Sequence, residues 1–205
     1  MTKNKQDTQN KLIRAVGEVL ADQGFSGVGV NAVAKKAGVD KVLIYRYFGS
    51  FDNLCTAFAQ SADFWPSLQE MIPDLDAMAN LGTAERITFV LKRYANSLRN
   101  RPLTLEVMAW ELLERNAFTI ELENVREAFG LELNKTMREL PSAIDDHLND
   151  RVDWLAITTV LSAGLQYLAI RARKINTYNG IALNEDQGWE QLERSVEVLI
   201  TGAAN

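Results

Sequence analysis

Cysteine, histidine and proline are scarce in this chain of 205 residues, and their scarcity excludes several classes of protein. The single cysteine, Cys55, cannot form an internal disulfide, which excludes a secreted scaffold held together by disulfides. The single histidine, His147, lies far from Cys55 in the sequence, and the two cannot build a usual structural zinc site. Only 4 prolines and 12 glycines interrupt the chain, so a collagen-like or linker-rich protein is excluded as well.

The motifs of the common enzyme classes are also lacking. The sequence has no G-x-S-x-G motif, no glycine-rich phosphate-binding loop and no cluster of metal ligands. Glu111 and Glu114 are three residues apart and are expected to decorate one helix face. His147 stands among Asp145, Asp146 and Asp150, and a solvated loop is the expected setting. We therefore predict a protein that is not an enzyme and that holds no cofactor and no metal.

Long apolar runs are few. No apolar segment follows the early lysines, so no signal peptide is predicted. The longest uncharged stretch, residues 154–170, contains two threonines, a serine and a glutamine. We interpret it as a buried helix, because it is short and polar for a segment that spans a lipid bilayer. These features predict a cytoplasmic protein that has no membrane partner.

The remaining composition is that of a globular protein with an uneven charge distribution. Hydrophobic residues make up 47% of the chain and charged residues 24%, which leaves ample apolar surface to bury. The formal net charge is −5, yet residues 1–50 carry eight basic and four acidic side chains. The N-terminal segment is therefore positive and the remainder negative. This asymmetry predicts an anionic partner for the N-terminal segment alone.

Helical periodicity runs through nearly the whole chain and predicts an all-α fold of about nine helices. In the first helix, Leu12, Val16, Val19 and Leu20 share one face, and Gly24 ends it. Asp40 is a good N-cap for the third helix, and Ser50 for the fourth. Residues 66–82 are predicted to be irregular or weakly helical. The expected helices cover about residues 8–23, 30–37, 40–48, 50–65, 83–100, 102–112, 119–133, 150–174 and 184–200.

Residues 30–48 have the layout of a helix-turn-helix. Two short helical segments flank a tight turn at Gly38, and the small residue Ala34 allows the helices to approach closely. The second segment of such a motif enters the major groove of DNA. Lysine and arginine can meet phosphates or guanine edges, and tyrosine hydroxyls can reach phosphates. The predicted DNA-contacting residues are Asn31, Lys41, Leu43, Tyr45, Arg46 and Tyr47.

The segment from about residue 8 to 58 resembles the N-terminal DNA-binding domain of the tetracycline-repressor (TetR) family of bacterial transcription regulators. The resemblance covers about a quarter of the chain. It lies in GFSGVGVNAVAKKAGVDKVLIYRYFGSFDNL, residues 24–54. The matching positions are Gly24-Phe25, Ala34, Ala37-Gly38-Val39, the run Ile44-Tyr45-Arg46-Tyr47-Phe48, and Gly49-Ser50.

The resemblance implies a ligand-responsive regulator, most often a repressor, that binds a palindromic operator in double-stranded DNA as a homodimer. Residues 1–50 would form the DNA-binding domain and residues 51–205 the ligand-binding and dimerisation domain. Lys41, Tyr45 and Tyr47 match positions where the family contacts DNA. Three positions depart from the family pattern: Val28-Gly29 replace a threonine or serine, Phe51 replaces a lysine, and Leu43 replaces a small polar residue.

The resemblance also implies a cavity for a small effector, apolar or amphipathic, in the C-terminal domain. Aromatic and methionine side chains are the candidates for its lining, although such residues at helical spacing also form ordinary cores. These candidates are Trp65, Met71, Phe89, Tyr94, Met108, Trp110 and Phe118. The apolar stripes of the last two helices are the candidates for a homodimer interface. Those residues are Trp154, Ile157, Leu161, Gly164, Leu168, Trp189, Leu192, Val196 and Leu199.

A second interpretation stays open from the sequence. Gly29 and Phe51 remove a helix cap and a basic side chain that a DNA-binding head would use. A helical small-molecule-binding or interaction module with a decayed helix-turn-helix would carry the same features. The effector, the operator sequence, the regulated genes and the sign of regulation are not encoded in any recognisable motif.

Overall fold

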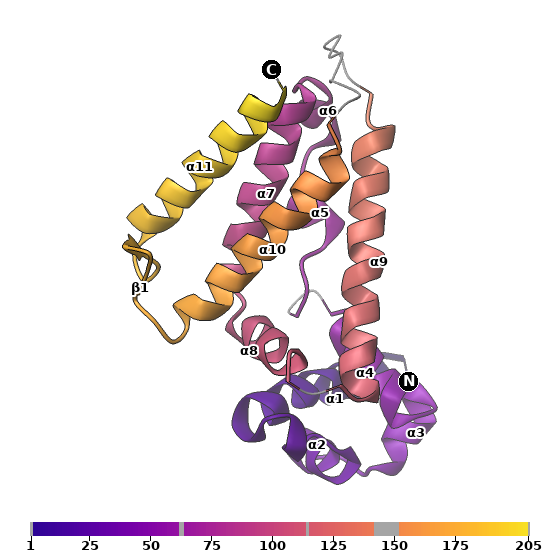
Figure 1. Cartoon of the computed structure of the whole chain (residues 1–205). Coiled ribbons are helices and arrows are strands. Elements are labelled where there is room, and N and C mark those ends of the chain that lie inside the picture. The colour runs from indigo at the N-terminus through magenta and orange to yellow at the C-terminus, as the bar shows by residue number, and fades with distance from the viewer. Residues whose placement is uncertain (1, 62–63, 114, 142–151, 205) are drawn as a thin grey trace. The chain divides into compact units, whose positions relative to one another are not determined.

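A computed structural model of the chain describes residues 2–61, 64–113, 115–141 and 152–204 (Figure 1). Within these residues the chain forms eleven α-helices, one short 3-10 helix and one hairpin of two short strands. The all-α prediction is therefore confirmed. The two helices beyond the predicted nine, α5 (Leu68–Met71) and α6 (Leu75–Ala79), lie in the segment that was expected to be irregular or weakly helical. Each is short and begins with a side-chain cap, from Ser67 and Asp74.

The chain folds into two compact units. The first comprises Met1–Trp65 and Glu106–Ala128, and the second comprises Pro66–Leu105 and Phe129–Asn205. The expected boundary between residues 50 and 51 lies inside the first unit, because the fourth helix packs against the first and the third. Two helices, α8 (Pro102–Glu111) and α9 (Ala117–Glu139), belong in part to each unit.

The N-terminal helices of the first unit form a small helical head. Its longest helix, α1, buries Leu12, Val16, Val19 and Leu20 completely, as the sequence periodicity predicts. Helices α2 and α4 pack against α1, and α3 packs against α4. Val33 of α2 and Ile44 of α3 are also completely buried. The elements are α1 (Thr2–Gln23), the 3-10 helix η1 (Phe25–Gly27), α2 (Val30–Ala37), α3 (Val42–Phe48) and α4 (Phe51–Ala59).

Local hydrogen bonds set the ends of these helices. Gly38 ends α2 in the left-handed conformation, with φ of 68°, which an L-residue with a side chain adopts less readily. Asp40 lies one residue before the N-cap of α3, which is Lys41 and not Asp40 as predicted, and its Oδ1 accepts from Val42 N, the first residue of the helix, at 2.8 Å. Ser50 caps α4 as predicted, its Oγ accepting from Asn53 N at 3.0 Å.

Aromatic rings join this head to α8 and α9 within the first unit. Phe25 of η1 lies edge-on to Trp110, with ring centroids 5.0 Å apart, and edge-on to Phe118 at 5.6 Å. Phe58 of α4 lies 6.4 Å from Phe118 and 4.8 Å from Phe64. Such pairs stabilise a fold beyond the burial of their surface, by about 0.5–1.5 kcal/mol each. Residues 106–128 and the head belong to the same compact unit.

The second unit is built around α7 (Thr83–Arg99). Helices α10 (Trp154–Ala172) and α11 (Asp186–Ala204) both pack against α7 (Figure 1). A hairpin of β1 (Thr177–Tyr178) and β2 (Ile181–Ala182) connects α10 to α11.

The sequence analysis missed this hairpin, although its turn has a recognisable signal. Asn179 and Gly180 both have positive φ, 49° and 84°, and the Asn-Gly pair is the usual sequence of such two-residue turns. The hairpin lies against the start of α11, where a Cβ on Gly188 would meet the carbonyl oxygen of Ala182 at 1.7 Å. Any side chain at position 188 would therefore push the hairpin away.

A buried arginine on α7 holds several helix ends of the second unit together. Arg86 is 3% exposed and donates only to backbone carbonyls in the hydrogen bonds that the structure records for it. Its Nε and Nη2 reach the carbonyls of Met78 and Ala79, at the end of α6, at 2.8 and 3.0 Å. Nη1 and Nη2 reach Leu140 and Pro141, just after α9, at 3.1 and 2.6 Å. The guanidinium thus donates to carbonyls at the end of α6 and just after α9, where helix ends leave backbone acceptors available.

Replacing Arg86 tests this arrangement. Arg86→Met leaves four carbonyls without their donor, and we expect the free energy of unfolding to fall by about 3 kcal/mol or more. Urea unfolding followed by circular dichroism measures the change. Arg138→Met, at an exposed arginine of α9, is the control and should change stability by about 0.5 kcal/mol at most. Equal stability of the two variants would contradict the proposed importance of the Arg86 contacts.

Candidate nucleic-acid interface

The outward side of α3 carries most of the predicted DNA-contacting residues. Ile44 is completely buried, which fixes the rotation of the helix about its axis. Lys41, Tyr45 and Arg46 are exposed, and Tyr45 keeps 51% of its surface accessible. Lys41 occupies the N-cap position, four residues before Tyr45, so the two share a face. The helix therefore presents two cations and a phenol to a partner.

Two other side chains of α3 complete this surface. Leu43 and Tyr47 are half-buried, so each divides its surface between the head and the solvent. Val42, which the sequence analysis did not select, is 61% exposed. An exposed aliphatic side chain on a reading helix can contact a thymine methyl group. Because Ile44 is buried, Val42, two residues earlier, lies on the outer side of the helix.

The positions that flank α3 contribute less. Asn31 is exposed near the start of α2. Gly29 stands at the N-cap of α2 and provides no side-chain cap, as the departure from the family pattern predicts. Phe51, at the first position of α4, is half-buried and brings no charge. The candidate surface is therefore concentrated on α3.

Basic side chains of the head differ in whether they are already paired. Lys36 donates to Asp22 of α1 at 2.7 Å and lies 3.9 Å from Glu18, so it ties α2 to α1. The hydrogen bond to Asp22 is the main reason why the pKa of Lys36 is raised above its ordinary value. Lys41 and Arg46 form no ion pair within the described part of the chain. These two cations are free to meet phosphates or base edges.

Two ionisable groups of the first unit, Glu111 and Cys55, have pKa values that are raised mainly by burial. Arg126 pairs with Glu111, its Nη1 donating to Oε1 at 2.7 Å, and lies over the ring of Trp65. Burial is the main reason why the pKa of Glu111 is raised, and the arginine opposes that shift. Burial also raises the pKa of the Cys55 thiol to about 12, so the thiolate that would act as a nucleophile is rare at neutral pH.

The predicted effector-binding residues are divided between the two units. Trp65, Met108, Trp110 and Phe118 belong to the first, while Met71, Phe89 and Tyr94 belong to the second. Trp65, Met71, Tyr94 and Met108 are buried, and the other three are half-buried. Trp110 and Phe118 contact Phe25 in the head, as described above. The phenol oxygen of Tyr94 accepts from Nε2 of Gln166 on α10 at 2.5 Å.

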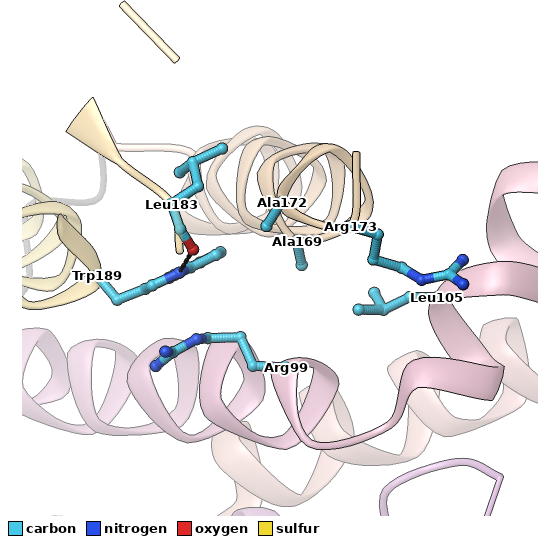
Figure 2. A pocket seen from close by; sticks show the side chains of 7 residues that line it. All are labelled: Arg99, Leu105, Ala169, Ala172, Arg173, Leu183 and Trp189. Carbon is cyan, nitrogen blue, oxygen red and sulfur yellow. Dashed lines mark hydrogen bonds between the residues drawn. The ribbon is translucent and has the colours of Figure 1, made fainter. Parts of the chain in front are cut away.

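Figure 2 shows a pocket in the second unit that the sequence analysis did not predict. It has a volume of about 180 Å³ and lies between α7, α10 and the start of α11. Trp189 is locked at its wall, because its Nε1 donates to Leu183 O at 2.9 Å and Arg99 lies over its ring at 4.8 Å. The small side chains of Ala169 and Ala172 point into the space from α10 (Figure 2). The lining consists of Arg99, Leu105, Ala169, Ala172, Arg173, Leu183 and Trp189.

A second pocket of the same unit, of about 220 Å³, is polar. Glu70 forms its acidic side and pairs with Arg101 at 2.6 Å. The hydrogen bond from Arg101 is the main reason why the pKa of Glu70 is lowered. Ser97 Oγ donates to the same carboxylate at 2.7 Å.

The residues predicted to form the homodimer interface differ in their exposure within the single subunit. Trp189 and Val196 are only 1% and 6% exposed, because they pack inside the subunit. Trp154, Ile157, Leu161, Leu168 and Leu192 are half-buried, whereas Gly164 and Leu199 are exposed. The outer face of α10 instead carries Ala156, Val160, Ala163, Gly164 and Tyr167, all exposed. On α11 the exposed apolar residues are Val198 and Leu199.

The prediction that residues 154–170 form a buried helix is wrong for the single subunit. By length and composition alone α10 qualifies as a membrane-spanning helix, and only 11% of its most apolar window is buried. Because this helix is apolar on all sides, the sequence could not show which face packs on α7. The structure leaves one apolar side of α10 exposed.

The residues considered for catalysis do not form a site in the described part of the chain. His147, Asp145, Asp146 and Asp150, and also Glu114, lie outside the described residues. Among the residues that are described, no group of three or more histidine, cysteine or acidic side chains is placed to hold a metal ion.

Comparison with known proteins identifies the segment that contains α3. The family model described as "Bacterial regulatory proteins, tetR family" matches residues 12–57. No curated protein matches the sequence of the chain. This match includes the head from the buried face of α1 to α4.

Solved structures with a similar fold cover nearly the whole chain. A TetR family transcription regulator from Marinobacter aquaeolei VT8 has a TM-score of 0.66 at 16% identity, covering 96% of this chain and 97% of its own. The fatty acid degradation regulator FadR from Bacillus halodurans has a TM-score of 0.65 at 16% identity, covering 95% of each chain. FadR from Bacillus subtilis in complex with stearoyl-CoA has a TM-score of 0.61 at 18% identity, covering 95% and 98%.

Substitutions on α3 separate the contributions of its two cations. Arg46→Ala should weaken binding to the recognised sequence by roughly 1–3 kcal/mol and relax specificity at one base pair in each half-site. Lys41→Ala should weaken binding to all sequences and lower the salt slope by roughly one unit, if Lys41 neutralises a phosphate. Fluorescence anisotropy over a salt series measures both.

Lys35→Ala, at an exposed lysine of α2, is the control. A variant with alanine at positions 41, 45, 46 and 47 that stays folded and binds like the parent would exclude α3 as the recognition helix.

Proposed function

We propose that the chain is a DNA-binding transcriptional regulator of the TetR family of bacterial regulatory proteins, whose family model matches residues 12–57, and that it acts as a ligand-responsive repressor in the cytoplasm. In this proposal two subunits bind a palindromic operator, each inserting α3 into the major groove. The observation that carries it is the outward side of α3, where Lys41, Tyr45 and Arg46 are exposed while Ile44 anchors the helix from within.

The exposed side of α10 supports the homodimer. Ala156, Val160, Ala163 and Tyr167 recur at helical spacing along one face, and Val160 is 71% exposed. The neighbouring helix α11 adds Val198 and Leu199, which are 71% and 58% exposed. Exposed apolar side chains of this kind are unfavourable in water unless a partner covers them. A second copy of the chain offers the same face, and two such helix pairs form a four-helix bundle.

A charge on this face tests the homodimer. Val160→Glu should convert the dimer to a monomer without lowering the stability of the subunit, because the side chain is exposed in the subunit and buried only in the dimer. Sedimentation velocity at micromolar concentration measures the change. Leu131→Glu, at an exposed leucine of α9, is the matched control and should leave the dimer intact. A parent protein that sediments as a monomer would refute the proposal, and one that partitions into detergent or vesicles would assign α10 to a membrane instead.

The proposed effector is an apolar or amphipathic small molecule bound by the second unit. One structural neighbour was solved with stearoyl-CoA, which makes acyl thioesters the first class to test. The pocket in Figure 2 joins apolar walls to two guanidinium groups, a combination that suits an amphipathic ligand. At about 180 Å³ it is smaller than the roughly 300–1,000 Å³ typical of sites for drug-sized ligands. A long acyl chain would therefore require the helices around it to separate.

Two helices of the second unit continue into the unit that contains the DNA-binding head. Helices α8 and α9 each begin or end in the second unit and continue into the first. In the first unit their residues Trp110 and Phe118 contact Phe25 of the head. A ligand that favours one arrangement of α8 or α9 would shift the head only by its difference in affinity for the two arrangements.

The function as a whole is tested by selecting DNA sequences and then adding candidate effectors. Selection from random duplexes should yield a palindromic site whose half-sites lie about one helical turn apart or a multiple of it. An effector at a concentration about 100 times its Kd should add about 2.7 kcal/mol of stability and raise the melting temperature by several degrees. The same compound should lower the affinity for the selected site. Absence of any selected sequence would favour an interaction module over a DNA-binding regulator.

A further inference from the structure

The first turns of α1 place a lysine beside the reading helix. Lys5 lies upstream of the segment that matches the family, residues 12–57, and was not among the predicted DNA-contacting residues. Its Nζ is 5.8 Å from the ring centroid of Tyr47, at the far end of α3 from Lys41. A cation at this distance from an aromatic face is attracted by the ring. The contact joins α1 and α3 within the first unit.

The orientation of Lys5 follows from the periodicity of α1. Leu12 and Val16, seven and eleven residues further on, lie on the same face of the helix as Lys5 because a turn takes 3.6 residues. Both are completely buried in the head, whereas Lys5 is exposed. The inward face of α1 thus extends beyond the core and ends in an ammonium group directed at α3 instead of an apolar side chain.

The charge of Lys5 is not compensated inside the protein. Within the described ranges Lys5 has no carboxylate at ion-pair distance, in contrast to Lys36 and Lys92. The first turn of α1 contains no acidic residue. A lysine close to the positive end of a helix dipole is unfavourable for the isolated helix, so an external anion would stabilise this turn.

The two cations match the spacing of the DNA backbones. A helix of seven residues such as α3 is about 10 Å long, and the major groove of B-DNA is about 12 Å wide. With Lys41 at one end of α3 and Lys5 near Tyr47 at the other, the cations flank the helix on both sides. An inserted α3 would bring each of them to one of the two phosphate backbones that border the groove.

We propose that Lys5 is a phosphate-contacting residue of the DNA interface, binding the backbone strand opposite to the one that Lys41 contacts. The proposal rests on the proposed insertion of α3 into the major groove and extends that interface to the start of α1. Lys5 also holds the ring of Tyr47, so that the tyrosine hydroxyl and the ammonium meet adjacent phosphate oxygens. The contact adds affinity for any duplex and no sequence preference.

Charge substitutions at positions 5 and 11 test this inference. The probe is a fluorescein-labelled duplex of mixed sequence, titrated with full-length protein over a salt series. Lys5→Gln should weaken binding several-fold at low salt and reduce the salt slope by about 0.9 for each bound subunit, the value for one phosphate. Lys5→Arg should keep both. Lys11→Gln removes the same charge from an exposed position on another side of α1 and should leave the slope unchanged.

The outcomes distinguish this inference from the proposed function. If the parent binds the duplex and Lys5→Gln keeps the parental slope, the role of Lys5 is refuted while DNA binding by α3 stands. Equal slope losses in Lys5→Gln and Lys11→Gln would also refute it, because the effect would then be one of net charge. A parent that binds no duplex refutes both proposals. Melting curves of each variant establish that the head remains folded.

Discussion

The burial of Ile44 is the constraint on which the proposed DNA-binding surface depends. Helix α3 is only seven residues long and would not be stable alone, so its orientation comes from packing and not from its own propensity. With Ile44 turned completely inward, Lys41, Tyr45 and Arg46 are exposed. The left-handed Gly38 and the side chain of Asp40 set where this helix begins. A rotation of α3 by one residue would exchange a reading side chain for a core side chain.

The same unit contains a second set of contacts that bears on regulation. Phe25 of the head contacts the rings of Trp110 and Phe118, which belong to α8 and α9. Because interiors are close-packed, a shift of either helix cannot be absorbed at this cluster without movement of its neighbours. The second unit has its own anchor in Arg86, whose bonds to the ends of α6 and to the residues after α9 fix one end of that unit. The pocket between α7 and α10 lies in the same unit, beside the locked ring of Trp189.

The charged and the apolar parts of the exposed surface suit different kinds of partner. The head carries uncompensated cations around α3, which suit an anionic polymer. The outer face of α10 carries almost no charge and suits a second protein surface. Where a basic residue serves the fold instead, as with Lys36, Arg86 and Arg126, a carboxylate or a set of carbonyls is found beside it. Basic residues that are paired within the subunit therefore serve the fold, and the unpaired ones around α3 are available to a ligand.

The sequence by itself determined the helical class and the helix-turn-helix, and it predicted most of the residues of the proposed DNA-binding surface. Periodicity and local caps are properties of a few consecutive residues, so Gly38, Ser50 and the stripe of α1 could be interpreted without any tertiary contact. Only the tertiary structure decided which face of α10 is exposed, because a helix that is apolar on all sides carries no pattern that distinguishes its partners. It also brought Lys5 to Tyr47 and Phe25 to Trp110, pairs separated by many residues whose proximity depends on how whole helices pack. Caps and helical periodicity depend on neighbouring residues, whereas contacts between distant segments form only when the chain has folded.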